Sequence, residues 1–207
     1  MKNPVIVFDL GGVLVDWNPR YLFRKIFSGD ETKTEWFLSK ICTGEWNATL
    51  DTGVSFEEHA RQLTERFPEY RSEIQAWHDR WEEMFNGPIH GTLEIFNELK
   101  KSGHRIYALT NWSRQTWPRG MKLFPFFREF DGHVVSGQEG FKKPDRRIFE
   151  VLLARYDLKP KDCLFIDDVP ANVEAAGKLG MIAIQFRTPE SLREELRKFS
   201  LLPAAQL

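Results

Sequence analysis

One carboxylate, Asp9, follows an apolar run at a point where the chain can turn sharply. The run Val5–Phe8 is β-branched and aromatic without polar alternation, which is typical of a parallel strand buried on both faces. Gly11 and Gly12 permit a tight turn after it, and open α/β sheets bind ligands at the carboxyl ends of their strands. Asp9 is therefore a candidate ligand-binding residue, although a lone Asp in this setting also serves as a turn cap.

Two other stretches carry groups suited to binding an anion. Thr110 and Asn111 follow the apolar residues 107–109, and a hydroxyl and an amide at a strand end can hydrogen-bond anionic oxygens. Lys143 stands just before a predicted helix, whose first turn offers free N–H groups to an anion. Taken singly, these stretches are also explained by a helix cap and by a solvated basic pair with Lys142.

The most specific pattern is a pair of adjacent carboxylates, Asp167 and Asp168, after the apolar residues 164–166. Two like charges side by side at a buried strand end cost free energy unless a cation or a lysine neutralises them. The pair therefore indicates a charged site at this end of the strand.

The elements that must position these residues alternate between strand and helix beyond residue 88. We predict strands over residues 105–109, around 133–135, 163–166 and 181–186, with helices over 92–101, about 145–156 and about 171–179. Strands separated by helices predict an α/β protein with a doubly wound parallel sheet.

The stretch between the first strand and residue 88 has a helical pattern instead. Apolar residues recur there at helical spacing in four segments, the last predicted to run from about residue 69 to 85. We therefore expect a helical cap domain of residues 17–88, inserted into an α/β core domain of residues 1–16 and 89–207.

Composition narrows the functional classes. The 207 residues carry 29 Lys and Arg against 30 Asp and Glu, a balance that does not favour nucleic acid as a partner. No apolar run approaches the length of a membrane span, and we recognise no signal peptide. Cys42 and Cys163 are far apart without metal-ligand spacing, so we expect a cytoplasmic protein with reduced core thiols.

The order of the four motifs resembles that of the haloacid dehalogenase (HAD) superfamily over nearly the whole chain. The matching motifs are Asp9, Thr110-Asn111, Lys143-Pro144 and Asp167-Asp168. The residues of these motifs are most similar to those of HAD-like phosphatases whose first motif reads Asp-x-Gly-Gly/Asn-Val. The resemblance implies a HAD-like Rossmannoid core with the first strand at the centre of the sheet and a small helical cap over the strands' carboxyl ends.

The resemblance also implies a role for each motif residue. Asp9 would be the catalytic nucleophile that forms a covalent aspartyl ester with the substrate, which splits a hard displacement into two easier ones. Thr110 and Asn111 would bind the transferring group. Lys143 would neutralise both the nucleophile and the developing charge.

A metal site is implied in the same way. Asp9, the backbone carbonyl of Gly11, Asp168 and, in support, Asp167 would hold Mg²⁺, a cation that prefers few carboxylates plus substrate oxygens. Asn172 would steady the loop that carries the two acids.

One departure from the resemblance bears on the reaction. Most HAD phosphatases have a second Asp two residues after the nucleophile as general acid, and here that residue is Gly11. The effect of such an acid is typically about 10²–10⁴-fold in rate, and Asp16 is one conceivable substitute.

We expect a Mg²⁺-dependent phosphatase of small phosphate monoesters, with sugar phosphates as the leading substrates. A metal-independent 2-haloacid dehalogenase, whose halide leaves unprotonated, and a weakly active HAD-fold ligand-binding protein stay as alternatives.

Substrate specificity is expected to depend on the cap. Residues 43–47 read as a polar and aromatic break between two cap helices, and Trp46 there could meet Trp112 over the substrate. Ordinary packing of either Trp is the competing interpretation. The expected partner is a small molecule, with no nucleic acid and no membrane, and the protein is expected to be a monomer or homodimer.

Overall fold

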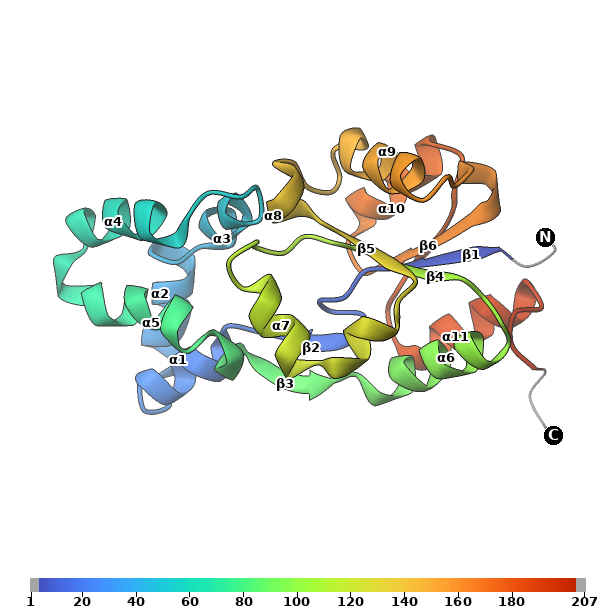
Figure 1. The fold of residues 1–207 in the computed structure, drawn as a ribbon. Helices are drawn as coiled ribbons and strands as arrows, with labels where there is room; N and C mark the ends of the chain where they lie inside the picture. Colours follow the sequence, from blue (N-terminus) through green and yellow to red (C-terminus); the bar gives the residue numbers. More distant parts are fainter. Residues whose placement is uncertain (1–3, 204–207) are drawn as a thin grey trace.

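The computed structural model describes residues 4–203 and contains one five-stranded parallel sheet, in the order β5-β4-β1-β6-β7 (Figure 1). The strands are β1 (Val5–Phe8), β4 (Ile106–Thr110), β5 (Gly132–Val135), β6 (Cys163–Asp167) and β7 (Ile182–Gln185). All pairings in this sheet are parallel, and β1 lies between β4 and β6. The predicted α/β fold with the first strand at the centre is confirmed.

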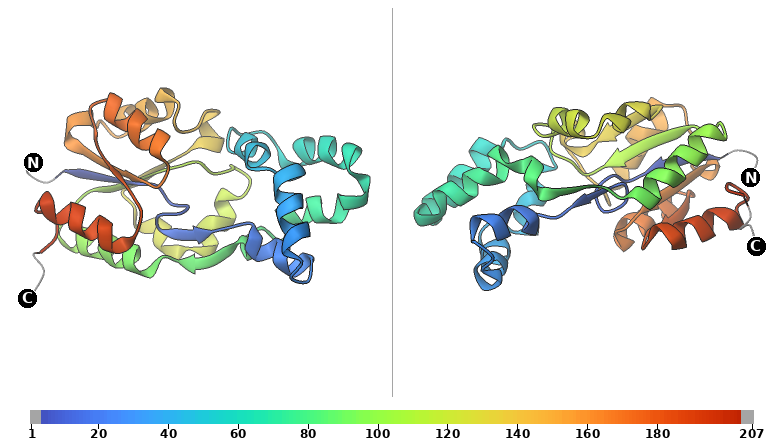
Figure 2. Two further views of the ribbon diagram at one scale, coloured as in Figure 1. Left: turned by 180° about the vertical axis from the view of Figure 1, so that it is seen from behind. Right: turned by 90° about the horizontal axis from the view of Figure 1, so that it is seen from below.

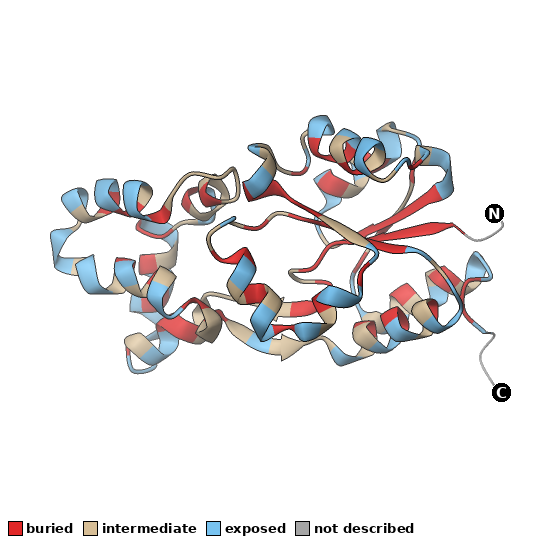
Figure 3. Cartoon of the chain, viewed as in Figure 1, coloured by how far each residue is buried: buried red, intermediate tan, exposed pale blue. Residues whose placement is uncertain are grey.

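Helices cover both faces of the sheet. In Figure 1, α6 (His90–Lys101) and α11 (Pro189–Lys198) lie on one face, and α9 (Arg146–Arg155) and α10 (Pro170–Lys178) lie on the other. Phe8 of β1 packs edge-on against Phe96 of α6, while the neighbouring Val7 belongs to a second hydrophobic cluster with Phe149 of α9. Because successive side chains of a strand point to opposite faces, burial on both faces requires an uninterrupted apolar run. Figure 3 shows the central strands buried along their length.

The helices inserted after β1 gather beyond the carboxyl ends of the strands (Figures 1 and 2). They are α1 (Arg20–Ile26), α2 (Glu31–Lys40), α3 (Gly44–Leu50), α4 (Phe56–Arg66) and α5 (Arg71–Asp79). Below, "cap" means these five helices and their connections. The chain enters the cap through β2 (Val15–Trp17) and leaves it through β3 (Phe85–Pro88), which pair as an antiparallel ribbon.

Two expectations for the cap are wrong. The predicted last helix of residues 69–85 is interrupted: α5 ends at Asp79, a short 3-10 turn follows, and Phe85 pairs with Trp17 in the ribbon. Pairing with a distant strand overrides the local helical periodicity there. The predicted break at residues 43–47 is the start of α3, because the Thr43 side chain caps this helix by accepting the Trp46 N–H at 3.1 Å.

Cys42 and Cys163 are both buried and free. Between residues 4 and 203, none of the helices combines the length and the hydropathy that a membrane span requires.

Candidate active site

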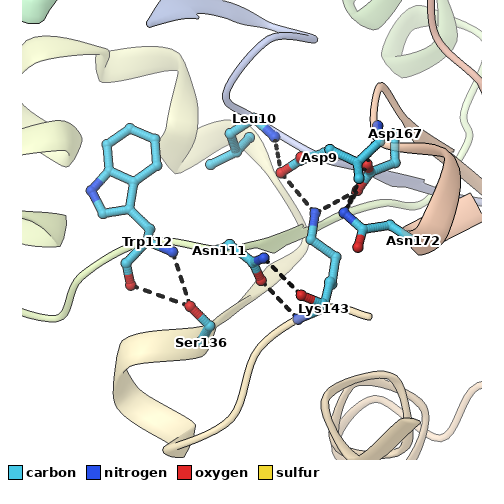
Figure 4. Close-up of polar contacts among 9 residues, drawn as sticks. Asp9, Leu10, Asn111, Trp112, Ser136, Lys143, Asp167 and Asn172 are labelled. Carbon is cyan, nitrogen blue, oxygen red and sulfur yellow. Dashed lines mark hydrogen bonds and ion pairs between the residues drawn. The ribbon is translucent and has the colours of Figure 1, made fainter. Parts of the chain in front are cut away.

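A buried ion pair network joins β1, β6 and the loop before α9 (Figure 4). Lys143 Nζ lies 2.9 Å from Asp9 Oδ1 and 2.6 Å from Asp167 Oδ2. Carboxylate oxygens of Asp9, Asp167 and Asp168 all lie within 4.8 Å of one another. One ammonium group therefore pairs with two carboxylates, and the third, that of Asp168, lies close to them at the carboxyl ends of two adjacent parallel strands.

The two neighbouring acids of β6 are held differently. Asp167 is fully buried, and its oxygens accept hydrogen bonds from Lys143, the Asn172 side chain (2.9 and 3.1 Å) and the Val169 N–H (2.9 Å). Asp168 lies on the cavity side, where its carboxylate approaches the backbone of Gly12. Asp167 thus fixes the lysine and the loop, while the carboxylate of Asp168 faces the cavity.

Burial dominates the electrostatics of this network. It raises the pKa of Asp9 to about 7, with Lys143 opposing the shift and Asp167 and Asp168 adding to it. Burial also raises the pKa of Asp168, and Asp167 adds to this. Burial opposes the charge on Lys143, but Asp9 and Asp167 outweigh it and raise its pKa. The uncompensated negative charge and the all-oxygen donor set fit a hard divalent cation such as Mg²⁺.

The end of β4 supplies polar groups on the other side of Asp9. The Asn111 side chain donates to the Lys143 carbonyl and accepts the Lys143 N–H, so it holds the lysine loop (Figure 4). The buried Thr110 hydroxyl has no hydrogen-bond partner among residues 4–203. Buried hydroxyls are normally paired, so this hydroxyl has a free hydrogen-bonding capacity, although Thr110 is not among the residues that line the cavity described below.

A cavity of about 290 Å³ opens between this network and the cap. Asp9 and Asp168 lie among its core-side lining residues, and six aromatic side chains from the cap, the ribbon and the core also line it. These rings are Trp17, Phe56, Trp77, Trp81, Phe85 and Trp112. The cavity thus combines a charged region with a mostly aromatic body, as small-molecule sites commonly do.

The sequence of the protein matches the family described as haloacid dehalogenase-like hydrolase over residues 4–180. The chain belongs to this family. It is therefore a hydrolase, as the resemblance of its four motifs implies.

Two relatives of this HAD-like hydrolase match it over nearly their full length. A sesquiterpene phosphatase of Aspergillus oryzae is 27% identical over 193 residues, covering 93% of this chain and 94% of that protein. A D-ribitol-5-phosphate phosphatase of Bacteroides thetaiotaomicron is 26% identical over 203 residues, covering 95% and 97%. Other relatives are longer: the chain spans 38% of bifunctional epoxide hydrolase 2 of Sus scrofa, at 29% identity over 217 residues.

Solved structures of the family share the fold. A HAD family enzyme of Bacteroides thetaiotaomicron in complex with magnesium and inorganic phosphate has a TM-score of 0.66 at 21% identity, covering 90% of this chain and 95% of that chain. The L-2-haloacid dehalogenase of Xanthobacter autotrophicus, with chloropropionic acid covalently bound, has a TM-score of 0.65 at 15% identity, covering 97% and 85%. This chain therefore shares its fold with an enzyme that binds magnesium and phosphate and with a dehalogenase.

Of the two tryptophans singled out in the sequence of this hydrolase, the structure brings one to the cavity. Trp112 lines it, stacked on Phe85 with ring centroids 5.8 Å apart. Trp46 is instead packed inside the cap, stacked on His59 at 5.3 Å and edge-on to Trp77. Both residues belong to α3, whose N-cap residue is Thr43: Trp46 is buried within the cap, and the next residue, Asn47, lines the cavity.

Asp16 is not among the residues that line the cavity. Its Oδ2 accepts hydrogen bonds from the Tyr21 hydroxyl at 2.7 Å and from the Asn86 side chain at 3.2 Å. It therefore ties the two strands of the ribbon to α1.

Two polar residues of the cap line the cavity without having been singled out in the sequence, Asp51 and His78. Asp51 stands in a turn, Asp-Thr-Gly, that ends at Gly53. An acidic residue in a connection between two cap helices was the available signal, since functional side chains are frequently found in loops.

Proposed function

We propose that the protein is a Mg²⁺-dependent phosphatase that hydrolyses small phosphate monoesters through an aspartyl phosphate on Asp9. The observation that carries this proposal is the cluster of three carboxylates, two of which pair with the ammonium group of Lys143. Such a site repels a free halocarboxylate and favours a divalent cation together with a phosphoryl group.

Asp9 is arranged to attack with one defined oxygen. Its Oδ1 accepts the Leu10 N–H at 2.7 Å and lies 2.9 Å from Lys143 Nζ, whereas no hydrogen bond to Oδ2 is found in the described chain. Oδ2 is therefore assigned the attack on phosphorus. Thr110 and Lys143 bind the equatorial oxygens of the phosphoryl group, and Asn111 keeps Lys143 in place.

The cation is assigned to the cavity-facing side of the network. Asp9, Asp168 and the Gly11 carbonyl are the proposed ligands, with Asp167 and Asn172 in support. When bound, Mg²⁺ neutralises the transferring group and orients it. Asp167 is assigned to Lys143 and the loop because its oxygens already have partners there.

The aromatic lining bears on the alcohol portion of the substrate. Sugar phosphates, the prediction from the sequence, require several hydroxyl partners, and the relative from Bacteroides acts on ribitol 5-phosphate by its name. The six rings of the cavity favour an alcohol with an apolar body instead, and the relative from Aspergillus is named for a sesquiterpene. We therefore propose monoesters of small apolar alcohols as the preferred substrates.

The runner-up is a 2-haloacid dehalogenase. It is favoured by the absence of an acidic residue at Gly11, since a halide leaves without a proton, and by the shared fold of a solved dehalogenase. The three clustered carboxylates oppose it, because that reaction needs no metal.

The test is a comparison of two products released by the purified protein. Phosphate release is measured from para-nitrophenyl phosphate, geranyl phosphate and ribitol 5-phosphate, each with Mg²⁺ and with EDTA. Halide release is measured in parallel from 2-chloropropionate. The proposal expects phosphate release that EDTA abolishes and no halide release. Metal-independent halide release without phosphate release would establish the dehalogenase.

A further inference from the structure

The position two residues after Asp9 carries no side chain that could act as a general acid. Gly11 has no side chain to protonate a leaving alcohol, and nothing among the described residues lies within 4 Å of where its Cβ would be. An alkoxide is a poor leaving group, so hydrolysis of an alkyl phosphate needs a proton from elsewhere. Asp16 is bonded within the ribbon and does not line the cavity.

A second carboxyl group reaches the cavity from the cap. Asp51 follows the last residue of α3, and it lines the same cavity as Asp9 and Asp168. No hydrogen bond or ion pair to its side chain is found between residues 4 and 203. A half-buried carboxyl group without a partner, facing a substrate-sized cavity, has no evident structural role.

The turn that carries Asp51 is docked on the core. Gly53 has a φ of +91°, and a Cβ there would lie 2.8 Å from the carbonyl oxygen of Gly137. The Gln115 side chain accepts the Phe56 N–H at 2.6 Å and donates to Glu57 at 3.0 Å. These contacts fix the connection between α3 and α4 against the core, so the position of Asp51 relative to Asp9 is defined.

The surroundings of Asp51 keep its proton available near neutral pH. Burial raises the pKa of Asp51 to about 7, against the opposing effect of Lys142 and Lys143. Asp9, Asp168 and His78 are the other titratable groups that line the cavity.

We propose that Asp51 is the general acid of the reaction, supplied by the cap. As Asp9 Oδ2 bonds to phosphorus and the bond from phosphorus to the alcohol oxygen breaks, the Asp51 carboxyl proton passes to that oxygen. The Asp51 carboxylate then takes a proton from the water that attacks the aspartyl phosphate, which releases phosphate and restores both acids. This assignment rests on the proposed phosphatase function.

The test compares two leaving groups in one variant. Para-nitrophenolate leaves without help, whereas n-butanol needs a proton, so Asp51→Asn should lower kcat for n-butyl phosphate by roughly 10²–10⁴-fold. Its kcat for para-nitrophenyl phosphate should change only a few-fold. Asp51→Glu should restore part of the n-butyl phosphate activity, and Asp79→Asn, at an exposed cap position, should change neither rate.

The outcomes separate the two proposals. Equal losses on both substrates would make Asp51 a structural residue, and a leaving-group-selective loss in His78→Asn in place of Asp51→Asn would transfer the role to His78. Either result overturns the inference. A wild-type protein that hydrolyses neither ester refutes the phosphatase function itself, whereas hydrolysis of para-nitrophenyl phosphate alone refutes only the proton donor.

Discussion

Asn111 holds the backbone of Lys143 on both sides. Its Nδ2 donates to the Lys143 carbonyl at 3.0 Å, and its Oδ1 accepts the Lys143 N–H at 2.8 Å. Asn111, at the end of β4, thereby positions Lys143, which lies 32 residues further along the chain and pairs with Asp9. Asn111 thus acts on the reaction through Lys143.

Replacement of Asn111 should therefore act through Lys143. Asn111→Ala leaves the N–H and carbonyl of Lys143 without these partners, which should cost about 1–3 kcal/mol of unfolding free energy. Because Lys143 Nζ then loses its fixed position, kcat for para-nitrophenyl phosphate should fall about 10²-fold. Urea unfolding and steady-state kinetics measure the two effects, with the exposed Asn97→Ala as control. An unchanged kcat in Asn111→Ala would show that Asn111 does not contribute to the reaction.

Loss of the lysine charge should destabilise the fold. Lys143→Met leaves the buried Asp9 and Asp167 without their common partner, a change that typically costs about 3–5 kcal/mol. The deficit should shrink at acidic pH, because protonation removes the uncompensated charges. Urea denaturation at neutral and acidic pH tests this, with Lys142→Met as the control. A deficit independent of pH would contradict it.

Stability without metal should depend on pH through Asp9. Its pKa is raised from 3.8 to about 7, so the folded protein keeps a proton that the unfolded chain releases. The free energy of unfolding should therefore fall as pH rises from about 4 to about 7 and level off above that range. Asp9→Asn should flatten part of this slope, while Asp51 and Asp168, whose pKa values are also raised, contribute to the remainder.

Mg²⁺ favours the ionised carboxylates, so its addition at neutral pH should raise the melting temperature of the wild-type protein. Calorimetry across the pH range measures both the fall in unfolding free energy with rising pH and the rise in melting temperature on addition of Mg²⁺. A stability that rises with pH in metal-free buffer would contradict the assignment.

The two glycines after Asp9 should respond differently to a methyl group. Gly12 has a φ of +75°, and a Cβ there would lie 2.6 Å from Asp168 Oδ2, so Gly12→Ala must displace that carboxylate. Gly11→Ala meets nothing within 4 Å among the described residues and serves as the matched control. Gly12→Ala should raise the Mg²⁺ concentration that gives half-maximal phosphatase activity by about tenfold or more. Equal Mg²⁺ requirements in the two variants would argue against Asp168 as a ligand.

The sheet and the motif residues could be predicted because their signals are local. The uninterrupted apolar runs before Asp9 and Asp167 mark strands buried on both faces, and parallel strands bring their carboxyl ends to one edge. Repulsion between Asp167 and Asp168 predicted a neutralising group, and Lys143 lies within 2.6 Å of Asp167. The sequence did not show that Asp167 binds Lys143 whereas Asp168 faces the cavity, because this difference depends on the conformation of the loop.

The cap was harder to predict because distant contacts decide its details. Phe85 pairs with Trp17 in the ribbon instead of continuing a helix, and Trp46 packs against His59 and Trp77 inside the cap instead of lining the cavity. Asp51 gave no distinctive signal, since an acid in a turn is common. Its place in the cavity depends on the docking of Gly53 against Gly137.

The central claim is that Asp9 attacks phosphorus, and acid quenching during turnover tests it most directly. Wild-type protein is mixed with excess para-nitrophenyl phosphate and Mg²⁺, quenched in acid within one turnover, and analysed by intact and peptide mass spectrometry. The account predicts a mass increase of one phosphoryl group on the peptide that contains Asp9, and no such increase in Asp9→Asn. Turnover by a wild-type protein that carries no phosphoryl group, or an Asp9→Asn variant with undiminished phosphate release, would contradict it.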